Sequence, residues 1–166
     1  GWSTFIPAYN AKELVNWLKL KIKGKKFNSE ILPWYRNFNG KIEKAQDNQY
    51  YTWGIVERIS TTKVKISELP IGVWTEKYVE HLNKLQDDQH IKNYRIISNG
   101  AGDTPPAFEI DMTREKLKSL EDDKLILEFF KLKSVLSTSN MHLISRGKIK
   151  KYDTITIVLL NLIYHI

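Results

Sequence analysis

The chain has 166 residues, of which 42% are hydrophobic and 11% aromatic, and it carries 26 Lys and Arg residues against 19 Asp and Glu residues. Its five tryptophans and high aromatic content exclude disorder throughout, and the length suits one domain with or without part of a second. The lack of cysteine excludes disulfide scaffolds and thiolate metal sites. The formal net charge of +7 favours a polyanionic partner.

Basic residues gather near the two ends of the chain. Residues 1–27 hold six lysines and one acidic residue, whereas residues 129–152 hold six basic residues and no acidic one. Two basic ends around a balanced middle indicate surfaces that face phosphates, and ordinary solvated charge is the alternative. The basic residues of the second stretch are Lys131, Lys133, Arg146, Lys148, Lys150 and Lys151.

The first expected element is an amphipathic helix. Asn10 predicts its N-cap and Gly24 its end, and apolar residues recur between them at helical spacing. A period of two then predicts strands over residues 41–44, 50–59 and 64–67, with a turn at 60–63 and Pro70 closing the third strand. The apolar residues of the helix are Leu14, Val15, Leu18 and Ile22.

A second helix is expected after Pro70, with Thr75 as its cap and one apolar stripe. Strands follow over residues 94–98 and 107–112, on either side of a loop rich in Gly and Pro. Thr113 opens a short helix, residues 122–130 add a further helical turn, and residues 131–152 suit a strand, a turn at Gly147 and a strand. The stripe of the second helix comprises Tyr78, Val79, Leu82 and Leu85.

This alternation of elements predicts an α+β fold with a mixed, largely antiparallel sheet and short amphipathic helices. The apolar tail, residues 154–166, has 13 residues, short of the roughly 20 that span a bilayer. We therefore expect a buried helix or strand there and no membrane partner.

Catalytic and metal sites find no support in the residue pattern. The four histidines lack metal-ligand spacing, and the carboxylates of Asp87–Asp88 and Glu121–Asp123 are chain neighbours that do not converge on one ion. No phosphate-binding glycine loop or nucleophile elbow occurs in the sequence. We expect no catalytic residue, no metal ligand and no cofactor in this chain.

A polar, basic segment from Lys131 to Asn140 instead suits contact with a nucleic-acid backbone. It combines two ammonium groups with five small hydrogen-bonding side chains, which bind phosphates and sugars without reading bases. Leu132, Val135 and Leu136 are expected to anchor it to the core, and an ordinary polar strand is the alternative. The candidate DNA contacts are Lys131, Leu132, Lys133, Ser134, Val135, Leu136, Ser137, Thr138, Ser139 and Asn140.

Trp74 allows two interpretations. A tryptophan at a strand-to-helix junction after Pro70 commonly packs in the core. An exposed indole at the same place suits contact with a nucleic-acid backbone. We include Trp74 among the candidate DNA contacts.

Three stretches of the chain carry a family resemblance. They read Gly1-Trp2-Ser3-Thr4-Phe5-Ile6-Pro7, Ile66-Ser67-Glu68-Leu69-Pro70-Ile71-Gly72-Val73-Trp74-Thr75 and Gly147-Lys148-Ile149-Lys150-Lys151-Tyr152-Asp153-Thr154. In this order they resemble the eukaryotic type IIA DNA topoisomerase, in the DNA-gate region that follows its catalytic tyrosine. The resemblance extends over about residues 1–156, and the loop at 99–106 and the tail after Ile155 depart from it.

The resemblance implies a tower-like α+β domain over residues 1–128, followed over 129–166 by a DNA-contacting segment and the start of a coiled arm. It places Trp74 and Lys131–Asn140 at DNA-contacting positions of the family. The family's catalytic tyrosine directly follows an arginine, and none of the eight tyrosines here does so. The whole enzyme is implied to be a nuclear homodimer that uses ATP and Mg²⁺.

The function expected from the resemblance is a part of an ATP-dependent type II topoisomerase that helps to bind and bend the gate duplex during double-strand passage. The alternative is a stand-alone nucleic-acid-binding or scaffold module with a tower-like fold. An arginine–tyrosine pair and an acidic Mg²⁺ cluster encoded upstream of Gly1 would favour the first.

Overall fold

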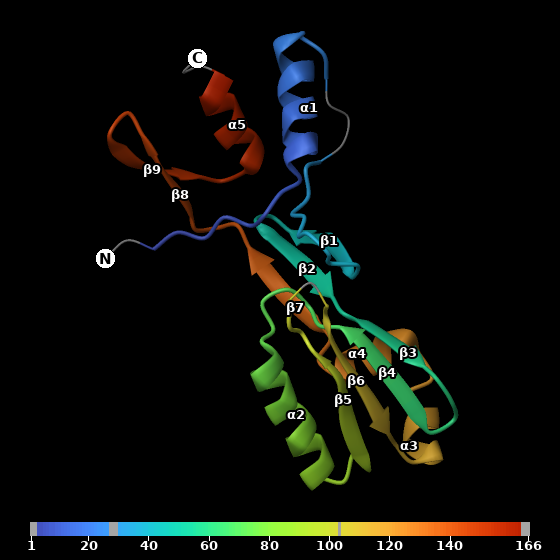
Figure 1. The fold of residues 1–166 in the computed structure, drawn as a ribbon. Helices are drawn as coiled ribbons and strands as arrows, with labels where there is room; N and C mark the ends of the chain where they lie inside the picture. Colours follow the sequence, from blue (N-terminus) through green and yellow to red (C-terminus); the bar gives the residue numbers. More distant parts are fainter. Residues whose placement is uncertain (1–2, 27–29, 103, 164–166) are drawn as a thin grey trace. The chain divides into compact units, whose positions relative to one another are not determined.

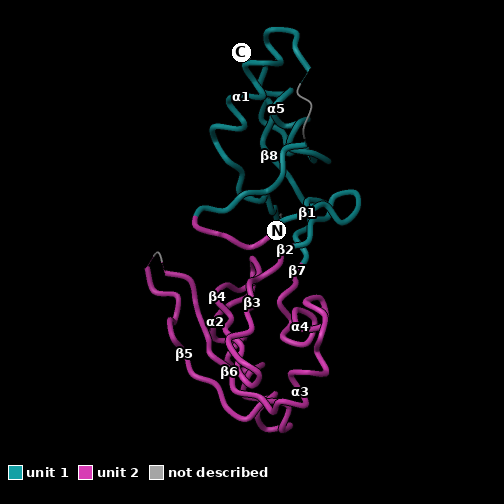
Figure 2. Tube along the Cα trace, turned by 90° about the vertical axis from the view of Figure 1, so that its right-hand side faces the viewer, with its two compact units in different colours: residues 1–36, 42–51, 135–166 teal, residues 37–41, 52–134 magenta. Residues whose placement is uncertain are grey.

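The computed structural model describes residues 3–26, 30–102 and 104–163, which fold into two compact units (Figures 1 and 2). Unit 1 comprises residues 1–36, 42–51 and 135–166, and unit 2 comprises residues 37–41 and 52–134. Gly1 and Trp2, which open the first family stretch, lie outside the described residues, as does the end of the apolar tail. The units interleave in sequence, and the expected boundary between residues 128 and 129 remains a prediction.

Unit 2 is built on an antiparallel four-stranded sheet with the order β3-β4-β6-β5 (Figure 1). Its strands are β3 (Ile55–Arg58), β4 (Lys63–Glu68), β5 (Asn93–Asn99) and β6 (Pro106–Asp111), and its helices are α2 (Thr75–Asp87), α3 (Arg114–Ser119) and α4 (Asp123–Phe129). This arrangement confirms the α+β class and the predicted strand pair around residues 94–112.

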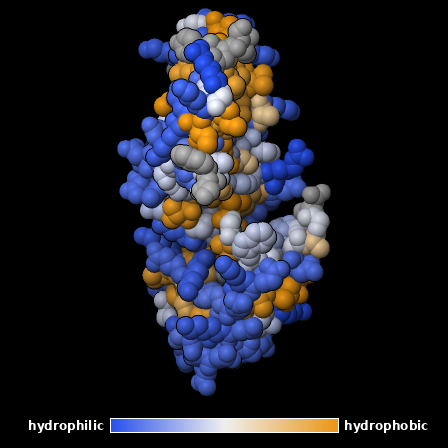
Figure 3. Space-filling model, turned by 90° about the vertical axis from the view of Figure 1, so that its left-hand side faces the viewer, coloured by the Kyte–Doolittle hydropathy of each residue, from blue (hydrophilic) through white to orange (hydrophobic). Residues whose placement is uncertain are grey.

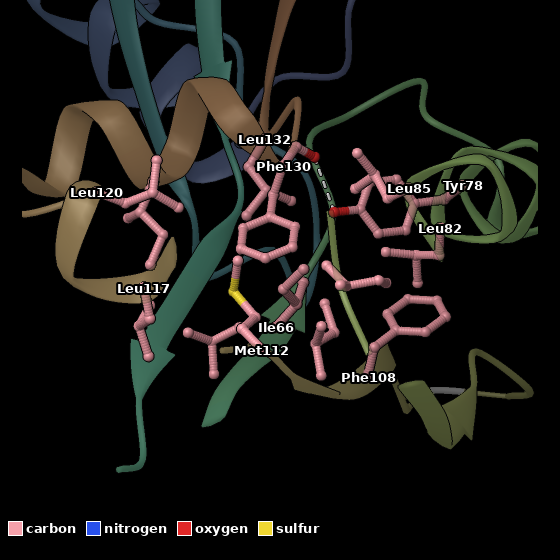
Figure 4. Packing of buried hydrophobic residues seen from close by; sticks show 14 of the residues in the cluster. Ile66, Tyr78, Leu82, Leu85, Phe108, Met112, Leu117, Leu120, Phe130 and Leu132 are labelled. Carbon is pink, nitrogen blue, oxygen red and sulfur yellow. Dashed lines mark hydrogen bonds between the residues drawn. The ribbon is translucent and has the colours of Figure 1, made fainter. Parts of the chain in front are cut away.

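One face of this sheet is apolar because its strands alternate in and out. Phe108, Ile110 and Met112 are fully buried and pack with apolar side chains from α2, α3 and α4 in one cluster (Figure 4). The other face carries ion pairs, with Glu109 bonded at 3.0 Å to both Lys63 and Arg95. The helices therefore pack against the apolar face.

The α2 helix follows its predicted pattern. Tyr78, Leu82 and Leu85 are buried in the cluster, and Val79 packs partly against it. In Figure 3 the α2 side of unit 2, in the lower half of the view, is largely hydrophilic. The helix begins one residue earlier than predicted, however, because Trp74 is the N-cap and Thr75 is already helical.

Unit 1 contains the helices α1 (Ala11–Ile22) and α5 (Ile155–Ile163) and the hairpin of β8 (Met141–Ser145) and β9 (Lys148–Tyr152). The predicted turn at Gly147 joins these two strands. Residues 155–163 of the apolar tail form a helix, in which Leu159 is buried and Ile157 and Leu162 are exposed. Trp17 of α1 and Leu159 of α5 share a buried cluster with Ile31. A third sheet has the order β1-β2-β7 and consists of β1 (Lys41–Gln46), β2 (Gln49–Trp53) and β7 (Lys133–Ser137).

The predicted caps of α1 are confirmed, but its predicted apolar stripe is partly wrong. The Asn10 side chain accepts hydrogen bonds from the backbone of the first turn, and Gly24 follows the helix with φ +68°. Val15 and Ile22 are exposed, whereas Trp17 is buried. Trp17 packs in one cluster with Leu14 and Leu18, so the buried face is turned towards position 17 and away from positions 15 and 22.

The predicted strand over residues 50–59 is divided at Gly54 into β2 and β3, which belong to different sheets. The Gly54 N–H donates to the Leu132 carbonyl at 2.9 Å. A Cβ atom at position 54 would collide with the Glu68 carbonyl oxygen and lie 3.1 Å from the Leu132 side chain. Close approach of two other segments at this glycine therefore ends one strand and begins the next.

Candidate nucleic-acid interface

Trp74 lies on the surface of unit 2. Its indole is 71% exposed, so the interpretation of Trp74 as a core residue is wrong. Its backbone is extended, with φ −76° and ψ 140°, and its carbonyl accepts the first helical hydrogen bond from Tyr78 at 3.0 Å. The backbone of Trp74 is thus fixed by α2 while its side chain remains open to a ligand.

A tight turn leads into Trp74. The Val73 N–H donates to the Pro70 carbonyl at 3.2 Å, and Gly72 has φ +83°, a conformation that favours glycine. Val73 then packs partly against the core. The sequence from Pro70 to Val73 therefore delivers the chain to the start of α2 in one defined conformation.

Lys131 is turned outwards by the end of α4. Its φ is +51°, and its N–H donates to the Glu128 carbonyl at 3.0 Å while the Leu132 N–H donates to the Leu127 carbonyl at 2.8 Å. This is the left-handed termination that commonly closes a helix. Phe130 and Leu132 are fully buried on either side, so the exposed ammonium of Lys131 stands on a firmly packed backbone.

Two side chains of α2 bind the backbone directly before Lys131. The Tyr78 hydroxyl donates to the Phe130 carbonyl at 2.8 Å (Figure 4), and His81 hydrogen-bonds the Phe129 carbonyl. Trp74 and Lys131 are 57 positions apart in the sequence, yet they belong to two elements that are bonded directly to each other. The helix that begins after Trp74 is thus bonded to the backbone that leads into Lys131, and both candidate contacts belong to unit 2.

Lys133 and Ser134 complete the part of the segment that belongs to unit 2. The Lys133 ammonium lies 4.7 Å from the ring centroid of Trp53, within the range of a cation–π contact. The Ser134 hydroxyl donates to the Ile71 carbonyl at 2.7 Å and lies 2.7 Å from the Thr52 hydroxyl. Lys133 is exposed, whereas Ser134 is half-buried and bonded inside the protein.

The rest of the segment belongs to unit 1. Val135 is 53% exposed, so its predicted role as an anchor is wrong, whereas Leu136 is buried as predicted. Adjacent residues of a strand point to opposite faces, and β7 turns Leu136 inwards and Val135 outwards. Thr138 is buried and donates its N–H to the Asn48 carbonyl at 2.8 Å.

The last residues of the segment are held by hydrogen bonds within the segment and to residues near the start of the chain. The hydroxyls of Ser137 and Ser139 lie 2.8 Å apart, and Ser139 is exposed. The Asn140 side chain donates to the Ser3 hydroxyl at 3.2 Å, and its carbonyl accepts from the Phe5 N–H at 2.9 Å. Within unit 2, residues 131 and 133 are exposed and residue 132 is buried. Within unit 1, residues 135 and 139 are exposed, whereas residues 136 and 138 are buried and are not open to a ligand.

His81 lies close enough to Lys131 to be affected by its charge, and nothing in the sequence pattern connects His81 with the site. Burial is the main cause that lowers its pKa below the ordinary value of a histidine, and the charge of Lys131 acts in the same direction. The bond to Phe129 opposes these effects. The neutral ring is therefore the form that suits this place in the fold.

We expect stability to fall as the pH drops from about 7 to 5, because the unfolded chain then binds the His81 proton more readily than the folded chain does. The stabilisation that the neutral His81 ring provides is complete above the pKa of the unfolded chain, near 6.5, and is lost as the pH falls below that value. His81→Asn retains a donor for the Phe129 carbonyl and should reduce the fall in melting temperature over this range. The exposed His90, changed to Asn, is the control, and an equal reduction there would contradict the assignment.

Among residues 3–26, 30–102 and 104–163 there is no group of three His, Asp or Glu side chains suited to a metal ion. The Mg²⁺ implied for the whole enzyme therefore has no assigned ligands among these residues, and we derive no step through it. Within the described residues, none of the helices has the length and apolar character needed to cross a membrane.

Comparison with known proteins finds a matching family model and similar relatives. The family model for the A subunit of DNA gyrase/topoisomerase IV matches residues 1–166. DNA topoisomerase 2 of Plasmodium falciparum is 37% identical over 156 residues, which are 93% of this chain and 11% of the relative. DNA topoisomerase 2-alpha of Homo sapiens is 35% identical over 163 residues, 96% of this chain and 10% of the relative.

A solved structure shares the fold. The crystal structure of the Plasmodium falciparum topoisomerase II DNA-binding, cleavage and re-ligation domain matches 99% of this chain with a TM-score of 0.87 and 34% identity, and the match covers 22% of that chain. The chain spans about a tenth of the length of the curated relatives it matches. The chain therefore belongs to the family of the DNA gyrase/topoisomerase IV A subunits and is similar to the DNA topoisomerase 2 proteins.

Proposed function

We propose that this chain is the part of a type II DNA topoisomerase that binds the gate duplex and helps to bend it. The parent enzyme would be an ATP-dependent, Mg²⁺-using nuclear homodimer that passes one duplex through another. The likeness to DNA topoisomerase 2 over nearly the whole chain supports this proposal. The chain itself would contribute binding surface and no catalytic residue.

The observation that carries the proposal is the pairing of an exposed indole with an exposed ammonium on two bonded elements. Trp74 stands at the start of α2, and α2 holds the carbonyl groups just before Lys131 through Tyr78 and His81. Ammonium groups bind phosphates, and an exposed indole can pack against the sugars and phosphates of the backbone. Lys133, Ser137, Ser139 and Asn140 would extend the backbone contacts along the segment.

Lysines that bind phosphates and an indole that packs against the backbone suit a protein that binds DNA without reading its sequence. The polar groups that Lys131–Asn140 exposes are ammonium, hydroxyl and amide groups, which suit phosphate and sugar oxygens. Bending a duplex costs several kcal/mol by order of magnitude, and added backbone contacts offset that cost. The proposal therefore predicts binding that depends on salt far more than on base sequence.

We expect the 166-residue chain to bind unrelated duplexes with similar affinity. If about four phosphates are neutralised, log K should fall with log salt concentration with a slope of about −3.6. Fluorescence anisotropy with two labelled duplexes of different sequence, titrated from low to moderate salt, measures both quantities. A flat salt dependence, or a strong preference for one duplex, would count against the proposal.

A further inference from the structure

We propose that Thr52 and Ser134 are positioning residues, which hold the turn before Trp74 in the conformation that binds the duplex. This inference rests on the proposed DNA-binding function and goes beyond it. It also gives Ser134 a role different from the direct DNA contact expected from the sequence. All of the groups that carry it belong to unit 2.

Three hydrogen bonds link these residues to one peptide segment. The Ile71 N–H donates to the Thr52 hydroxyl oxygen at 3.1 Å, and the Ser134 hydroxyl donates to the Ile71 carbonyl at 2.7 Å. The two hydroxyl oxygens lie 2.7 Å apart. Both backbone polar groups of Ile71 are therefore bonded to side chains from two strands, β2 and β7.

The positions of the protons follow from this arrangement. A hydroxyl group donates one proton, and the proton of Ser134 goes to the Ile71 carbonyl. The proton between the two hydroxyls must then come from Thr52, whose oxygen accepts the Ile71 N–H. The three groups form a closed ring in which each donates once and accepts once. The proton of Ser134 is thus already used and is not free to reach a phosphate.

The ring supplies hydrogen-bond partners for the backbone N–H and carbonyl of Ile71, which the turn's own hydrogen bond does not use. Ile71 is the second residue of the turn Pro70–Val73, and the turn's own hydrogen bond uses only Val73 and Pro70. Thr52 is fully buried, so its side chain would otherwise lack water as a partner. Trp74 follows Ile71 by three residues, and a turn ordered before binding loses less entropy when the duplex arrives.

The test uses Thr52→Val, which keeps the shape of the side chain, and Ser134→Ala, which removes one hydroxyl. Each should weaken duplex binding about 3- to 10-fold, since one hydrogen bond contributes on the order of 1 kcal/mol. The salt slope should stay unchanged, because no charge is removed. Ser134→Thr, which restores a hydroxyl, should bind as the original chain does.

A second readout follows Trp74 in the free protein. Fluorine NMR of the chain labelled with 5-fluorotryptophan, with the Trp74 signal assigned through Trp74→Phe, should show that signal shifted or broadened in both variants. Ser119→Ala is the matched control, since its exposed hydroxyl donates to the Lys116 carbonyl and not to the turn, and Ser119 lies outside the DNA-contacting segment. In a Trp74→Ala background, Ser134→Ala should cost little further affinity.

Several results would overturn the inference. If Ser134 bound phosphate directly, Ser134→Ala would weaken binding with the Trp74 signal unmoved, and Thr52→Val would leave binding intact. Equal shifts of all the tryptophan signals would indicate general unfolding rather than positioning. Should Thr52→Val fail to fold, the half-buried Ser134 carries the same test. If the original chain bound no duplex, the proposed function would fail, while the NMR readout would still decide whether the ring holds the turn.

Discussion

Replacement of Leu132 by alanine is expected to lower the free energy of unfolding by about 2–5 kcal/mol. Leu132 is fully buried in the main cluster of unit 2, and its Cδ2 atom lies 3.1 Å from where a Cβ of residue 54 would be. Removing its branched side chain leaves a cavity that the surrounding strands fill only in part. Urea denaturation followed by far-UV circular dichroism measures this loss.

Val135→Ala is the control for this experiment. It lies three residues away in the same segment, but its side chain is 53% exposed, and its truncation should change stability by no more than about 0.5 kcal/mol. Equal losses for the two variants would contradict the inward and outward alternation of this segment. Leu132→Ala should also weaken duplex binding, because Leu132 anchors the backbone that carries Lys131 and Lys133.

The elements that the sequence predicts well are those with strong local signals. Asn10 and Thr113 cap helices through side-chain hydrogen bonds, and Phe108, Ile110 and Met112 alternate into the core as their spacing indicates. These features depend on neighbours within a few residues. Composition and periodicity therefore suffice to place them and to assign the α+β class.

The features that the sequence does not predict depend on partners far along the chain. Gly54 divides a continuous β pattern because Glu68 and Leu132 approach its backbone. Trp74 is exposed although tryptophan after a strand commonly packs inside, because α2 directs Tyr78 rather than Trp74 into the core. Neither outcome has a signal in the adjacent residues.

The candidate site shows the same division. Its exposed cations, Lys131 and Lys133, and their apolar anchors Leu132 and Leu136 can be found from the alternation of charge and hydrophobicity. The supports cannot be found in this way, because Thr52 and Ser134 are 82 positions apart and meet at the backbone of Ile71. The sequence shows only that Thr52 is a polar residue in a predicted strand, which does not identify its partner.

Removal of the two lysine charges should change how DNA binding responds to salt. Lys131→Ala with Lys133→Ala eliminates two phosphate contacts, so the slope of log K against log salt should become shallower by about 1.8. The matched control changes Lys92 and Lys118, two exposed lysines of unit 2 outside the segment. It removes the same net charge and should leave most of the slope in place.

Trp74→Ala should separate shape from charge at the same surface. Because the indole is 71% exposed, its loss should leave the melting temperature nearly unchanged, whereas removal of a buried tryptophan would cost about 3–5 kcal/mol. Covering the indole against sugars and phosphates contributes about 1.5–3 kcal/mol, so affinity should fall about 10- to 150-fold with the salt slope preserved. Salt titrations and melting curves on the same samples measure both effects. A large loss of melting temperature, or a slope that changes as much as with the lysine pair, would remove Trp74 from the interface and leave the segment at residues 131–140 to bind the duplex through charge alone.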